Sequence, residues 1–580
     1  MKWQIKSKAP SAFFKQFPEF SSLIVQLLYN RDLKTQKEID EFFNPDFETD
    51  LHDPFLLKGM NKAVKRIKKA IEKQEKISVY GDFDADGICA SAVLYLTLKE
   101  LGIKNIDTYI PDREKENHGL NNESIKYLAK NGTKLIITVD CASSNIKEVD
   151  LANSLGIDVI ITDHHIVGKK MPKAVALINP WQKDDKYPFK KLAGTGVAYK
   201  LVCALLSDDP FKKWLLDLTA LATVSDMMPI VGENRTLVKY GLGVLAQTKW
   251  LGLMELMKVS KVVPEIVQSS LKGKAPLTNL DTNILGFFLG PRLNAASRMD
   301  HADGAFNLLI CKNKKKAEIL AKKINQNNSL RQSATEKLIK EIETRLKEKS
   351  SKDKYLKIIF EGSPDWSSGL IGLAAGKIAD KYGCVTIIYN QKGDLINASC
   401  RTGCQFNLIK ALDKCSHLIS DYGGHKAAAG FMIKASKLDQ FKNIFNKLVK
   451  KEVKDKELIP VLKIDAELFL EDINWLNYDK IQMFAPFGKD NTMPNFLVKN
   501  LEICSLRTVG NGDKHLKMEL IMFGKKGKAK KINAIAFGLG ERVSLLKKGN
   551  SIDVVFELII NEWNGRRDLE MKIVDLKLTE

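Results

Sequence analysis

The sequence has few of the features that mark secreted or membrane proteins. Its 9 cysteines in 580 residues are too few and too scattered for a disulfide framework. No apolar run approaches the length needed to cross a bilayer, and the first residues, MKWQIKSKAPSAFFKQF, lack the continuous apolar stretch of a signal peptide. We therefore expect a cytoplasmic protein with reduced thiols and no membrane partner.

Acidic residues are also in deficit. The chain has 70 Asp and Glu against 91 Lys and Arg, a formal net charge of +21. A composition of 44% hydrophobic and 28% charged residues is that of a globular protein and excludes a collagen-like or wholly disordered chain. The basic surplus favours a polyanionic partner, with nucleic acid ahead of a membrane surface, although a lysine-rich proteome gives the same balance.

The order of apolar, polar and glycine-rich segments indicates several domains. Strand-like and helical patterns alternate after residue 60, which predicts an α/β fold with a doubly wound parallel sheet. A long polar run without Pro or Gly predicts a connecting helix, a second α/β unit follows it, and alternating strand patterns near the C-terminus predict a small barrel. The expected divisions are a cap at 1–60, the doubly wound domain at 61–250, a helical segment and connecting helix at 251–354, the second α/β domain at 355–455 and the barrel at 460–580.

Acidic and imidazole side chains follow three of the predicted parallel strands. Asp82 and Asp84 stand in GDFDADG, Asp140 ends the next strand, and Asp163, His164 and His165 end the one after. Ligands of open α/β sheets bind at the carboxyl ends of the strands, so we expect these side chains to converge. Asp226, which follows an apolar helix, is the remaining member of the set.

Carboxylates at this density repel one another unless cations neutralise them. An oxygen-rich set with one imidazole suits Mn²⁺ or Mg²⁺ better than zinc. Two such ions can activate water and stabilise the oxygens of a phosphoryl group. Each residue alone has an ordinary alternative, since Asp at a strand end often caps a helix and His is often a core residue. Their joint occurrence favours a metal-dependent phosphoryl-transfer site.

These motifs resemble those of a known superfamily. GDFDADG, Asp140, the DHH of residues 163–165 and SDMMP around Asp226 are similar, in order and spacing, to the four motifs of the DHH phosphoesterases. That superfamily includes pyrophosphatases, phosphodiesterases of short oligonucleotides or cyclic dinucleotides, and the RecJ single-stranded-DNA exonucleases. GGHKAAAG at 423–430 resembles the signature of the companion DHHA1 domain, which the pyrophosphatases lack.

Further motifs resemble the RecJ family in particular. They are PDREKENHGL, PRLNAASRMD, SCRTG and APFGKDNTMP, the last of which introduces an OB-like barrel. The chain departs from the family pattern at three loop positions, Ala142, Ser297 and His118. The resemblance covers nearly the whole chain and implies a DHH domain, a DHHA1 domain and an OB-like nucleic-acid-binding domain.

The resemblance implies a role for each site residue. Asp82, Asp84, Asp140, His164 and Asp226 would hold two ions, with Asp140 bridging them, and His165 would face the scissile phosphate, so that these six residues form the catalytic set. Asp163 would orient a histidine. The implied substrate contacts are Arg113, Arg298, Ser399, Arg401, Gly424 and His425, with Ser399 and Arg401 as candidates for a 5′ phosphate.

The implied activity is metal-dependent 5′-to-3′ hydrolysis of single-stranded DNA to 5′-mononucleotides in DNA repair and recombination. Single-stranded DNA is the implied partner, with a single-strand-binding protein and a helicase as further ones. Two alternatives remain open: a DHH–DHHA1 phosphodiesterase of short oligonucleotides or cyclic dinucleotides, and a non-catalytic relative that only binds single strands. Hydrolysis of a long strand compared with a dinucleotide separates the two enzymes.

Two features could contact the strand outside the active site. Trp366, Phe431, Phe487 and Trp563 could stack on bases, although most of them are better explained as core residues. The basic segment FGKKGKAKK at 523–531 could capture the strand, and a solvated hairpin explains it equally well.

Overall fold

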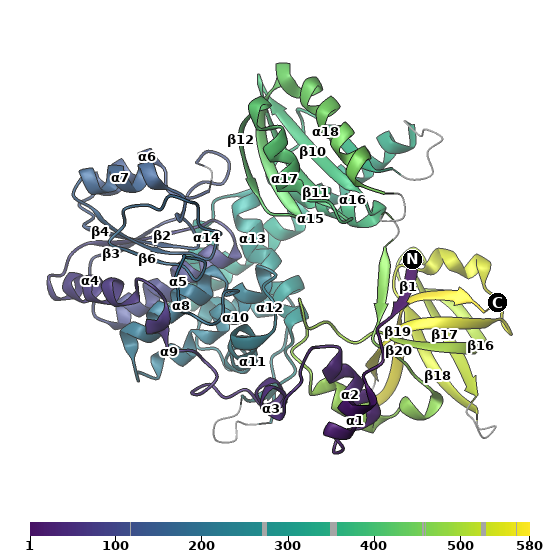
Figure 1. Ribbon diagram of the computed structural model, residues 1–580. Helices are drawn as coiled ribbons and strands as arrows, with labels where there is room; N and C mark the ends of the chain where they lie inside the picture. The colour runs from purple at the N-terminus through teal and green to yellow at the C-terminus, as the bar shows by residue number, and fades with distance from the viewer. Residues whose placement is uncertain are drawn as a thin grey trace. The chain divides into compact units, whose positions relative to one another are not determined.

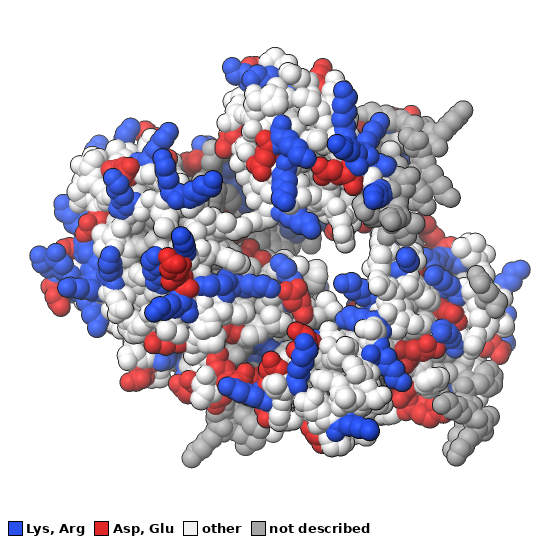
Figure 2. All heavy atoms as spheres, viewed as in Figure 1, with Lys and Arg blue, Asp and Glu red and all other residues white. Residues whose placement is uncertain are grey.

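A computed structural model of the chain describes residues 1–116, 118–268, 275–348, 356–454, 458, 460–523, 529–563 and 565–579. These residues form two compact units, Asp46–Ile459 on the one hand and Met1–Pro45 with Pro460–Glu580 on the other (Figure 1). Within the described ranges, no helix combines the length and apolar character that a membrane span requires. Lys and Arg side chains are spread over the visible face and interspersed with Asp and Glu (Figure 2).

The larger unit begins with alternating helices and strands: η1 (Pro54–Leu56), α4 (Met60–Glu72), β2 (Ile77–Gly81), α5 (Ala85–Glu100), β3 (Ile106–Tyr109), α6 (Asn122–Lys130), β4 (Leu135–Val139), α7 (Ile146–Ser154), β5 (Asp158–Thr162), β6 (Ala176–Ile178) and α8 (Gly194–Leu206). The strands form a parallel sheet in the order β3-β2-β4-β5-β6. Helices α4, α5 and α8 share a core with one face, and α6 and α7 with the other (Figure 1). The predicted doubly wound domain is confirmed.

The register of the sheet fixes where its functional edge lies. Strands β2, β4 and β5 pair in parallel, with Gly81 opposite Val139 and Val139 opposite Thr162. Strands β2 and β4 are buried along their whole length, because helices cover both faces, and this explains their continuous apolar sequences. The residues that follow these three strands therefore leave the sheet side by side.

A mainly helical segment follows: α9 (Phe211–Trp214), α10 (Leu216–Ser225), α11 (Gly232–Leu245), α12 (Leu251–Val259), β7 (Ile266–Gln268), β8 (Leu277–Thr278), the π-helix η2 (Ile284–Leu289), α13 (Gly290–Met299), α14 (Asp303–Leu309) and α15 (Lys314–Glu348). Helix α15 has 35 residues and is the predicted connecting helix. Its expected last residues, 349–354, lie outside the described ranges.

The larger unit ends with a second α/β fold: β9 (Ile358–Gly362), α16 (Ser368–Tyr382), β10 (Val385–Lys392), β11 (Leu395–Thr402), α17 (Leu408–Lys414), η3 (Ser416–Leu418), β12 (Ile419–Gly424), β13 (Ala428–Lys434), η4 (Ala435–Lys437) and α18 (Leu438–Glu452). The sheet order is β12-β13-β11-β10-β9, and β9 pairs in parallel with β10. Trp366 and Phe431 are buried in its core, as their interpretation as core residues predicts.

The smaller unit contains β1 (Lys2–Ile5), α1 (Ser11–Gln16), α2 (Ser22–Tyr29), α3 (Gln36–Phe43), β14 (Val461–Ile464), β15 (Ala466–Glu467), η6 (Leu470–Asp472), α19 (Trp475–Gln482), β16 (Phe496–Val509), β17 (His515–Phe523), β18 (Ala529–Ala536), η7 (Gly540–Leu545), β19 (Ser551–Trp563) and β20 (Arg566–Leu578). Its main sheet runs β15-β16-β17-β18-β20-β19, and pairing of β16 with β19 closes a five-stranded barrel. The predicted barrel is confirmed. Residues 524–528 of the basic segment and the side chain of Trp563 lie outside the description.

The N-terminal segment belongs to the barrel's unit. Helices α1, α2 and α3 contribute to the same hydrophobic core as the barrel strands, and β1 pairs in parallel with β14. The Lys6 ammonium lies 2.8 Å from the Asp465 carboxylate. The N-terminal segment is thus grouped with the barrel because the two share a hydrophobic core. The domain boundaries expected from the sequence remain predictions.

Candidate active site

The turn after β2 presents three carboxylates within five residues. Asp84 caps α5 by accepting hydrogen bonds from the backbone N–H groups of Asp86 and Gly87, at 2.9 and 3.1 Å. A side chain at Gly87 would meet the Asp82 carbonyl oxygen at 2.5 Å, so only glycine permits so tight a turn. Asp82 and Asp84 are thereby held on the same side of the turn.

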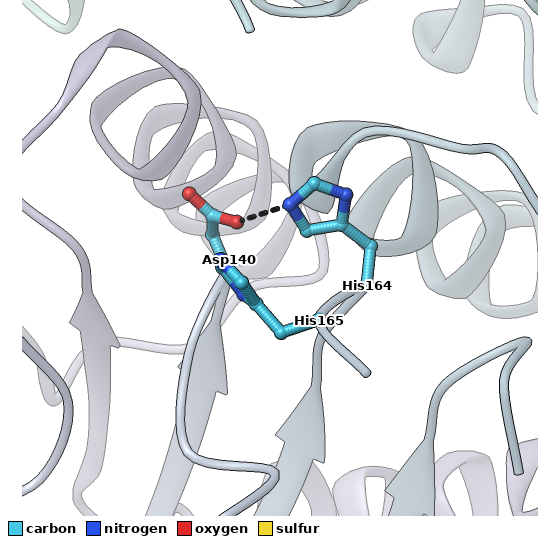
Figure 3. Close-up of side chains that lie close together, drawn as sticks. All are labelled: Asp140, His164 and His165. Atoms are coloured by element: carbon cyan, nitrogen blue, oxygen red, sulfur yellow. Dashed lines mark ion pairs between the residues drawn. The ribbon is translucent and has the colours of Figure 1, made fainter. Parts of the chain in front are cut away.

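Asp140 leaves the end of β4 in the left-handed backbone region, with φ of 62°. Its side chain is buried, and its Oδ1 lies 3.1 Å from Nε2 of His164 (Figure 3). The start of α8 packs directly against it, because a Cβ on Gly194 would stand 2.3 Å from the same oxygen. Close packing therefore fixes the position of the Asp140 carboxylate.

The two histidines after β5 are held in defined tautomers. Nδ1 of His164 lies 3.0 Å from the Leu192 carbonyl oxygen, which can only accept, so Nδ1 carries the proton and the Nε2 lone pair is free to bind a cation. Nδ1 of His165 lies 2.8 Å from the Asp163 carboxylate. Asp163 is buried and also accepts from the backbone N–H of Ser143 at 3.0 Å. This carboxylate therefore orients His165.

Asp226 completes the set from the C-terminal end of α10, where it is the capping residue. Its Oδ2 lies 3.7 Å from Nε2 of His164. The structure thus brings together all six residues predicted to be catalytic, although they come from four separate elements of the chain.

The site concentrates negative charge out of water. Burial and the charges of Asp82 and Asp86 raise the pKa of Asp84 to about 6. Burial and the neighbouring Asp86 and Asp84 raise the pKa of Asp140 well above its usual range. Burial also lowers the pKa of His164, which favours the neutral, metal-binding form. The cluster is electrostatically unbalanced as it stands.

Two buried oxygens identify what the cluster lacks. Among the described residues, neither Oδ1 of Asp82 nor Oδ1 of Asp140 accepts a hydrogen bond of good geometry. Nδ1 of His118 lies 3.1 Å from the first and Nε2 of His164 lies 3.1 Å from the second, and Asp82 raises the pKa of His118 to about 9 against the effect of burial. Ligand atoms of Asp82, Asp84 and Asp140 lie within 4.8 Å of one another, as do those of Asp86, His164 and Asp226. Both oxygens belong to the first of these groups, whereas the Asp86 oxygens of the second accept backbone hydrogen bonds. Two adjoining groups of oxygen ligands with one imidazole suit a pair of Mn²⁺ or Mg²⁺ ions.

Asp86 was not anticipated from the sequence. Its two carboxylate oxygens accept from the backbone N–H groups of Gly194 and Thr195, both at 2.7 Å. This contact holds the start of α8 against Asp140 and the adjoining Leu192 carbonyl against His164. The only local signal was a third Asp at a spacing of two, and nothing local pointed to partners more than 100 residues away.

A group of arginines, Arg113, Arg298 and Arg401, lies in the same unit as the acidic cluster. Arg401 donates from Nη1 to Ser399 Oγ at 3.0 Å and to the Cys400 carbonyl at 2.8 Å. Arg298 donates to the Gly369 carbonyl at 2.7 Å, and its buried Nε has no hydrogen-bond partner among the described residues. Burial, together with the charges of Arg113 and Arg331, lowers the pKa of Arg298 to about 9. Buried guanidinium groups with N–H donors left over are suited to binding an anion such as a phosphate.

The remaining predicted contacts are Arg113, His425 and Gly424. Arg113 donates to Ser297 Oγ at 3.4 Å, and its guanidinium lies 4.5 Å from the centre of the Phe83 ring, beside Asp82. His425 is exposed, and its ring stacks at 6.5 Å on that of His165. Gly424, with φ of 135°, adopts a backbone conformation that favours glycine. The structure thus places residues of both predicted α/β domains around one site.

Two exposed aromatic rings near the site were also missed. Phe287 and Phe288, on the π-helix η2, are 74% and 44% exposed. A Cβ on Gly290 would meet the Ser225 hydroxyl at 2.2 Å, so η2 ends against the residue before Asp226. No periodicity distinguishes these phenylalanines from core residues, which is why the sequence could not single them out.

Comparison with known proteins is consistent with these observations. Residues 76–223 match the DHH family N-terminal domain, 354–451 the DHHA1 domain and 464–575 the RecJ OB domain. The chain is 35% identical to the single-stranded-DNA-specific exonuclease RecJ of Bacillus subtilis over 586 residues, covering 100% of this chain and 71% of that protein. It is 30% identical to the Escherichia coli protein of the same name, covering 89% of this chain and 90% of that protein.

Solved structures of RecJ proteins are also similar to this chain. RecJ of Thermus thermophilus in complex with Mn²⁺ superposes with a TM-score of 0.83 at 25% identity, covering 100% of this chain and 80% of that one. The Mg²⁺ complex gives 0.76 at 24% identity, covering 100% and 79%. The three domain matches, their order and the full-length similarity together establish that the chain belongs to the RecJ family.

Proposed function

We propose that the protein is a metal-dependent exonuclease that hydrolyses single-stranded DNA from the 5′ end to 5′-mononucleotides. The RecJ relatives are named single-stranded-DNA-specific exonucleases. One observation carries the proposal for this chain: buried carboxylate oxygens without hydrogen-bond partners lie in the same unit as an arginine cluster whose buried nitrogen also lacks one. A phosphodiester held between bound cations and these arginines would satisfy both.

We assign the two ions to Asp82, Asp84, Asp140, His164 and Asp226, with Asp140 shared. Bound Mn²⁺ or Mg²⁺ supplies Lewis acidity and lowers the pKa of a water molecule. The protein's contribution is to hold the ligands rigidly. Gly194 packs on Asp140, and the Leu192 carbonyl directs Nε2 of His164 toward the carboxylates.

His165 is assigned to the scissile phosphate. Burial opposes its protonation, but the hydrogen bond to Asp163 and the negative charge of Asp163 together outweigh burial and raise the pKa of His165. A protonated ring held through Nδ1 presents Nε2–H as a donor to a phosphoryl oxygen, where it would stabilise developing negative charge. Asp163 acts as a positioning residue.

Arg113, Arg298, Ser399, Arg401, Gly424 and His425 are assigned to the strand. Ser399 and Arg401 would bind a 5′ phosphate, since Ser399 Oγ already accepts a hydrogen bond from Arg401 and both side chains are half-buried. A phosphate fixed on this side of the metal centre would set the direction of hydrolysis. Single-strand-binding protein and a helicase are the protein partners we propose, and repair and recombination in the cytoplasm the setting.

The test compares three substrates with Mn²⁺ or Mg²⁺: a long 5′-phosphorylated single strand, the same strand in a duplex, and a dinucleotide. We expect rapid release of mononucleotides from the 5′ end of the single strand alone. Preference for the dinucleotide would instead identify an oligonucleotide phosphodiesterase. Binding of the strand without hydrolysis under all metal conditions would identify a non-catalytic protein.

A further inference from the structure

His118 lies beside the acidic cluster and has no role in the assignments above. It is also one of the three positions at which the chain departs from the RecJ family pattern. Its Nδ1 lies 3.1 Å from Oδ1 of Asp82, and its side chain is 47% exposed. The ring therefore borders the buried carboxylates on one side and solvent on the other.

The pair formed by His118 and Asp82 repeats the geometry of a pair already assigned to an ion. Nε2 of His164 likewise lies 3.1 Å from Oδ1 of Asp140 (Figure 3). Both oxygens are buried, and among the described residues neither accepts a hydrogen bond of good geometry, so each ring nitrogen lies beside its oxygen without donating to it. Two atoms that bind one ion at roughly 2.1 Å and at a right angle to each other lie about 3 Å apart. Both distances thus suit neighbouring ligands of a single ion.

The backbone next to His118 is anchored to the elements that carry the metal ligands. Gly119 has φ of 85°, and a Cβ there would meet Oδ1 of Asn145 at 2.5 Å, so this turn packs closely on the loop after β4. The Gly119 carbonyl oxygen accepts a hydrogen bond from the Tyr80 hydroxyl at 3.0 Å. Tyr80 belongs to β2, which leads directly into Asp82. The position of His118 relative to Asp82 is therefore set by the fold.

Two neighbouring rings limit the rotation of the His118 imidazole. The Phe83 ring packs edge-on against it at 6.4 Å, and the His165 ring packs edge-on at 5.2 Å. His165 is itself held by Asp163 through a contact of 2.8 Å. The imidazole is thus oriented before any ligand arrives, which is what a metal ligand requires.

We propose that His118 binds, through Nδ1, the ion held by Asp82, and that this nitrogen favours Mn²⁺ over Mg²⁺. The inference rests on the metal assignment of the proposed function. Imidazole nitrogen is a softer donor than carboxylate oxygen and suits a first-row transition ion, whereas Mg²⁺ prefers oxygen ligands and retains its waters. Each of the two ions would then have one imidazole ligand, since His164 serves the other.

Two other roles for His118 predict different measurements. A protonated ring that only pairs with Asp82 would repel an incoming cation, so its removal should leave metal affinity unchanged or increase it. A ring that contacts only a DNA phosphate would affect strand binding and leave metal affinity unchanged. The sign of the change in metal affinity when the ring nitrogen is removed therefore separates the three roles.

The experiment is titration calorimetry of the full-length protein without DNA, with Mn²⁺ and Mg²⁺ in separate runs at pH 8. H118F keeps an aromatic ring but has no nitrogen. We expect it to weaken Mn²⁺ binding at one of two sites by about tenfold or more, since changes to residues that merely support a ligand already cost about 10–100-fold. Mg²⁺ affinity should fall less, because Mg²⁺ replaces a lost ligand with water.

H118N is the conservative variant. Its amide oxygen can stand near the position of Nδ1 and offers Mg²⁺ a suitable donor. We expect H118N to restore most of the Mg²⁺ affinity and only part of the Mn²⁺ affinity. A purely structural role for His118 predicts no such difference between the two ions.

His301 provides the matched control. Its Nδ1 lies 3.2 Å from a carboxylate oxygen of Asp303, outside the acidic cluster. H301F should bind both ions like wild type. Thermal unfolding in EDTA checks that each variant is folded. If H118F does not fold, H118N decides alone, and an unchanged ratio of Mn²⁺ to Mg²⁺ affinity in that variant would overturn the inference.

Wild-type or tighter Mn²⁺ binding by H118F, while the wild-type protein binds two ions, would overturn the inference and leave the proposed function standing. Equal losses for Mn²⁺ and Mg²⁺ that H118N does not restore would also overturn it, because they would reflect a displaced loop. If the wild-type protein binds no Mn²⁺, the metal assignment of the proposed function fails, and the role of His118 fails with it.

Discussion

The larger unit contains two clusters of opposite charge: an acidic cluster of Asp82, Asp84 and Asp140, and an arginine cluster of Arg113, Arg298 and Arg401. Among the described residues, Asp82 and Asp140 each leave a buried oxygen without a hydrogen-bond partner, whereas Arg298 leaves a buried nitrogen without one. Burial and mutual repulsion raise the pKa values of Asp84 and Asp140, and burial together with neighbouring arginines lowers the pKa of Arg298. Each cluster is destabilising alone and complementary to a ligand of opposite charge. Ligand binding, rather than folding, therefore explains the composition of both clusters.

The largest effect is expected from Asp140→Asn. Loss of a shared ligand should remove both ions and lower strand hydrolysis by ~10³-fold or more. The metal-free protein should unfold at the same or a higher temperature, because a repelled carboxylate becomes a neutral amide. Mn²⁺ titration calorimetry and thermal unfolding in EDTA measure the two effects.

Asp217→Asn is the matched control. Asp217 is equally buried, its pKa is raised to about 7 by burial, and its carboxylate accepts a hydrogen bond from the Thr248 hydroxyl at 2.6 Å. This variant should keep Mn²⁺ binding and hydrolysis. If this variant loses both Mn²⁺ binding and hydrolysis, replacing any buried carboxylate would have the same effect. The result would then contradict the assignment of Asp140 as a shared metal ligand.

Gly194→Ala tests whether packing positions the acidic cluster. The added methyl would meet Asp140 at 2.3 Å and push the start of α8 away from Asp86. We expect hydrolysis to fall by about 10²-fold, in line with the effect of small displacements at catalytic groups. Gly376→Ala, inside α16 with no atom within 4 Å, should keep full activity and gain about 0.5–1 kcal/mol of stability. Equal activity of the two variants would refute the packing argument.

Arg401→Ala tests the arginine cluster. Binding of a 5′-phosphorylated strand should weaken by about 1.5–3 kcal/mol through loss of a charge-assisted hydrogen bond. Mn²⁺ binding should be unaffected, and a 5′-hydroxyl strand should show a much smaller loss. Equal losses on the two strands would assign Arg401 to the general backbone and move end selection to Arg113 or Arg298.

The smallest effect concerns pH. In EDTA, Asp84 has a folded-state pKa of about 6, above its unfolded value near 3.8. Its contribution to stability is therefore fully present below about pH 4 and is lost as pH rises through 6, about 3 kcal/mol over the whole range. With Mn²⁺ the trend should reverse, because metal binding needs deprotonated carboxylates. Urea unfolding at pH 5 and 8, with and without Mn²⁺, measures both trends. If stability falls with rising pH in Mn²⁺ as it does in EDTA, the metal assignment is contradicted.

The sequence predicted the parts of the site that local pattern determines. Apolar runs that end in Asp82, Asp140 and Asp163 predicted buried parallel strands, and the rule that ligands bind at their carboxyl ends predicted convergence. Asp86 escaped notice because its partners, Gly194 and Thr195, lie on a distant helix. The exposed Phe287 escaped notice because exposure depends on tertiary packing. The roles of the site residues and the domain boundaries remain predictions.

The shared core of the N-terminal helices and the barrel has a consequence for biosynthesis. Residues 1–45 leave the ribosome before residues 46–459, yet their strand partner β14 and the barrel core come after residue 459. The intervening unit can complete its own core while the first segment waits, since domains generally fold as units during synthesis. The apolar faces of α1–α3 are therefore exposed for most of translation, which makes this segment the part of the nascent chain most dependent on protection from aggregation.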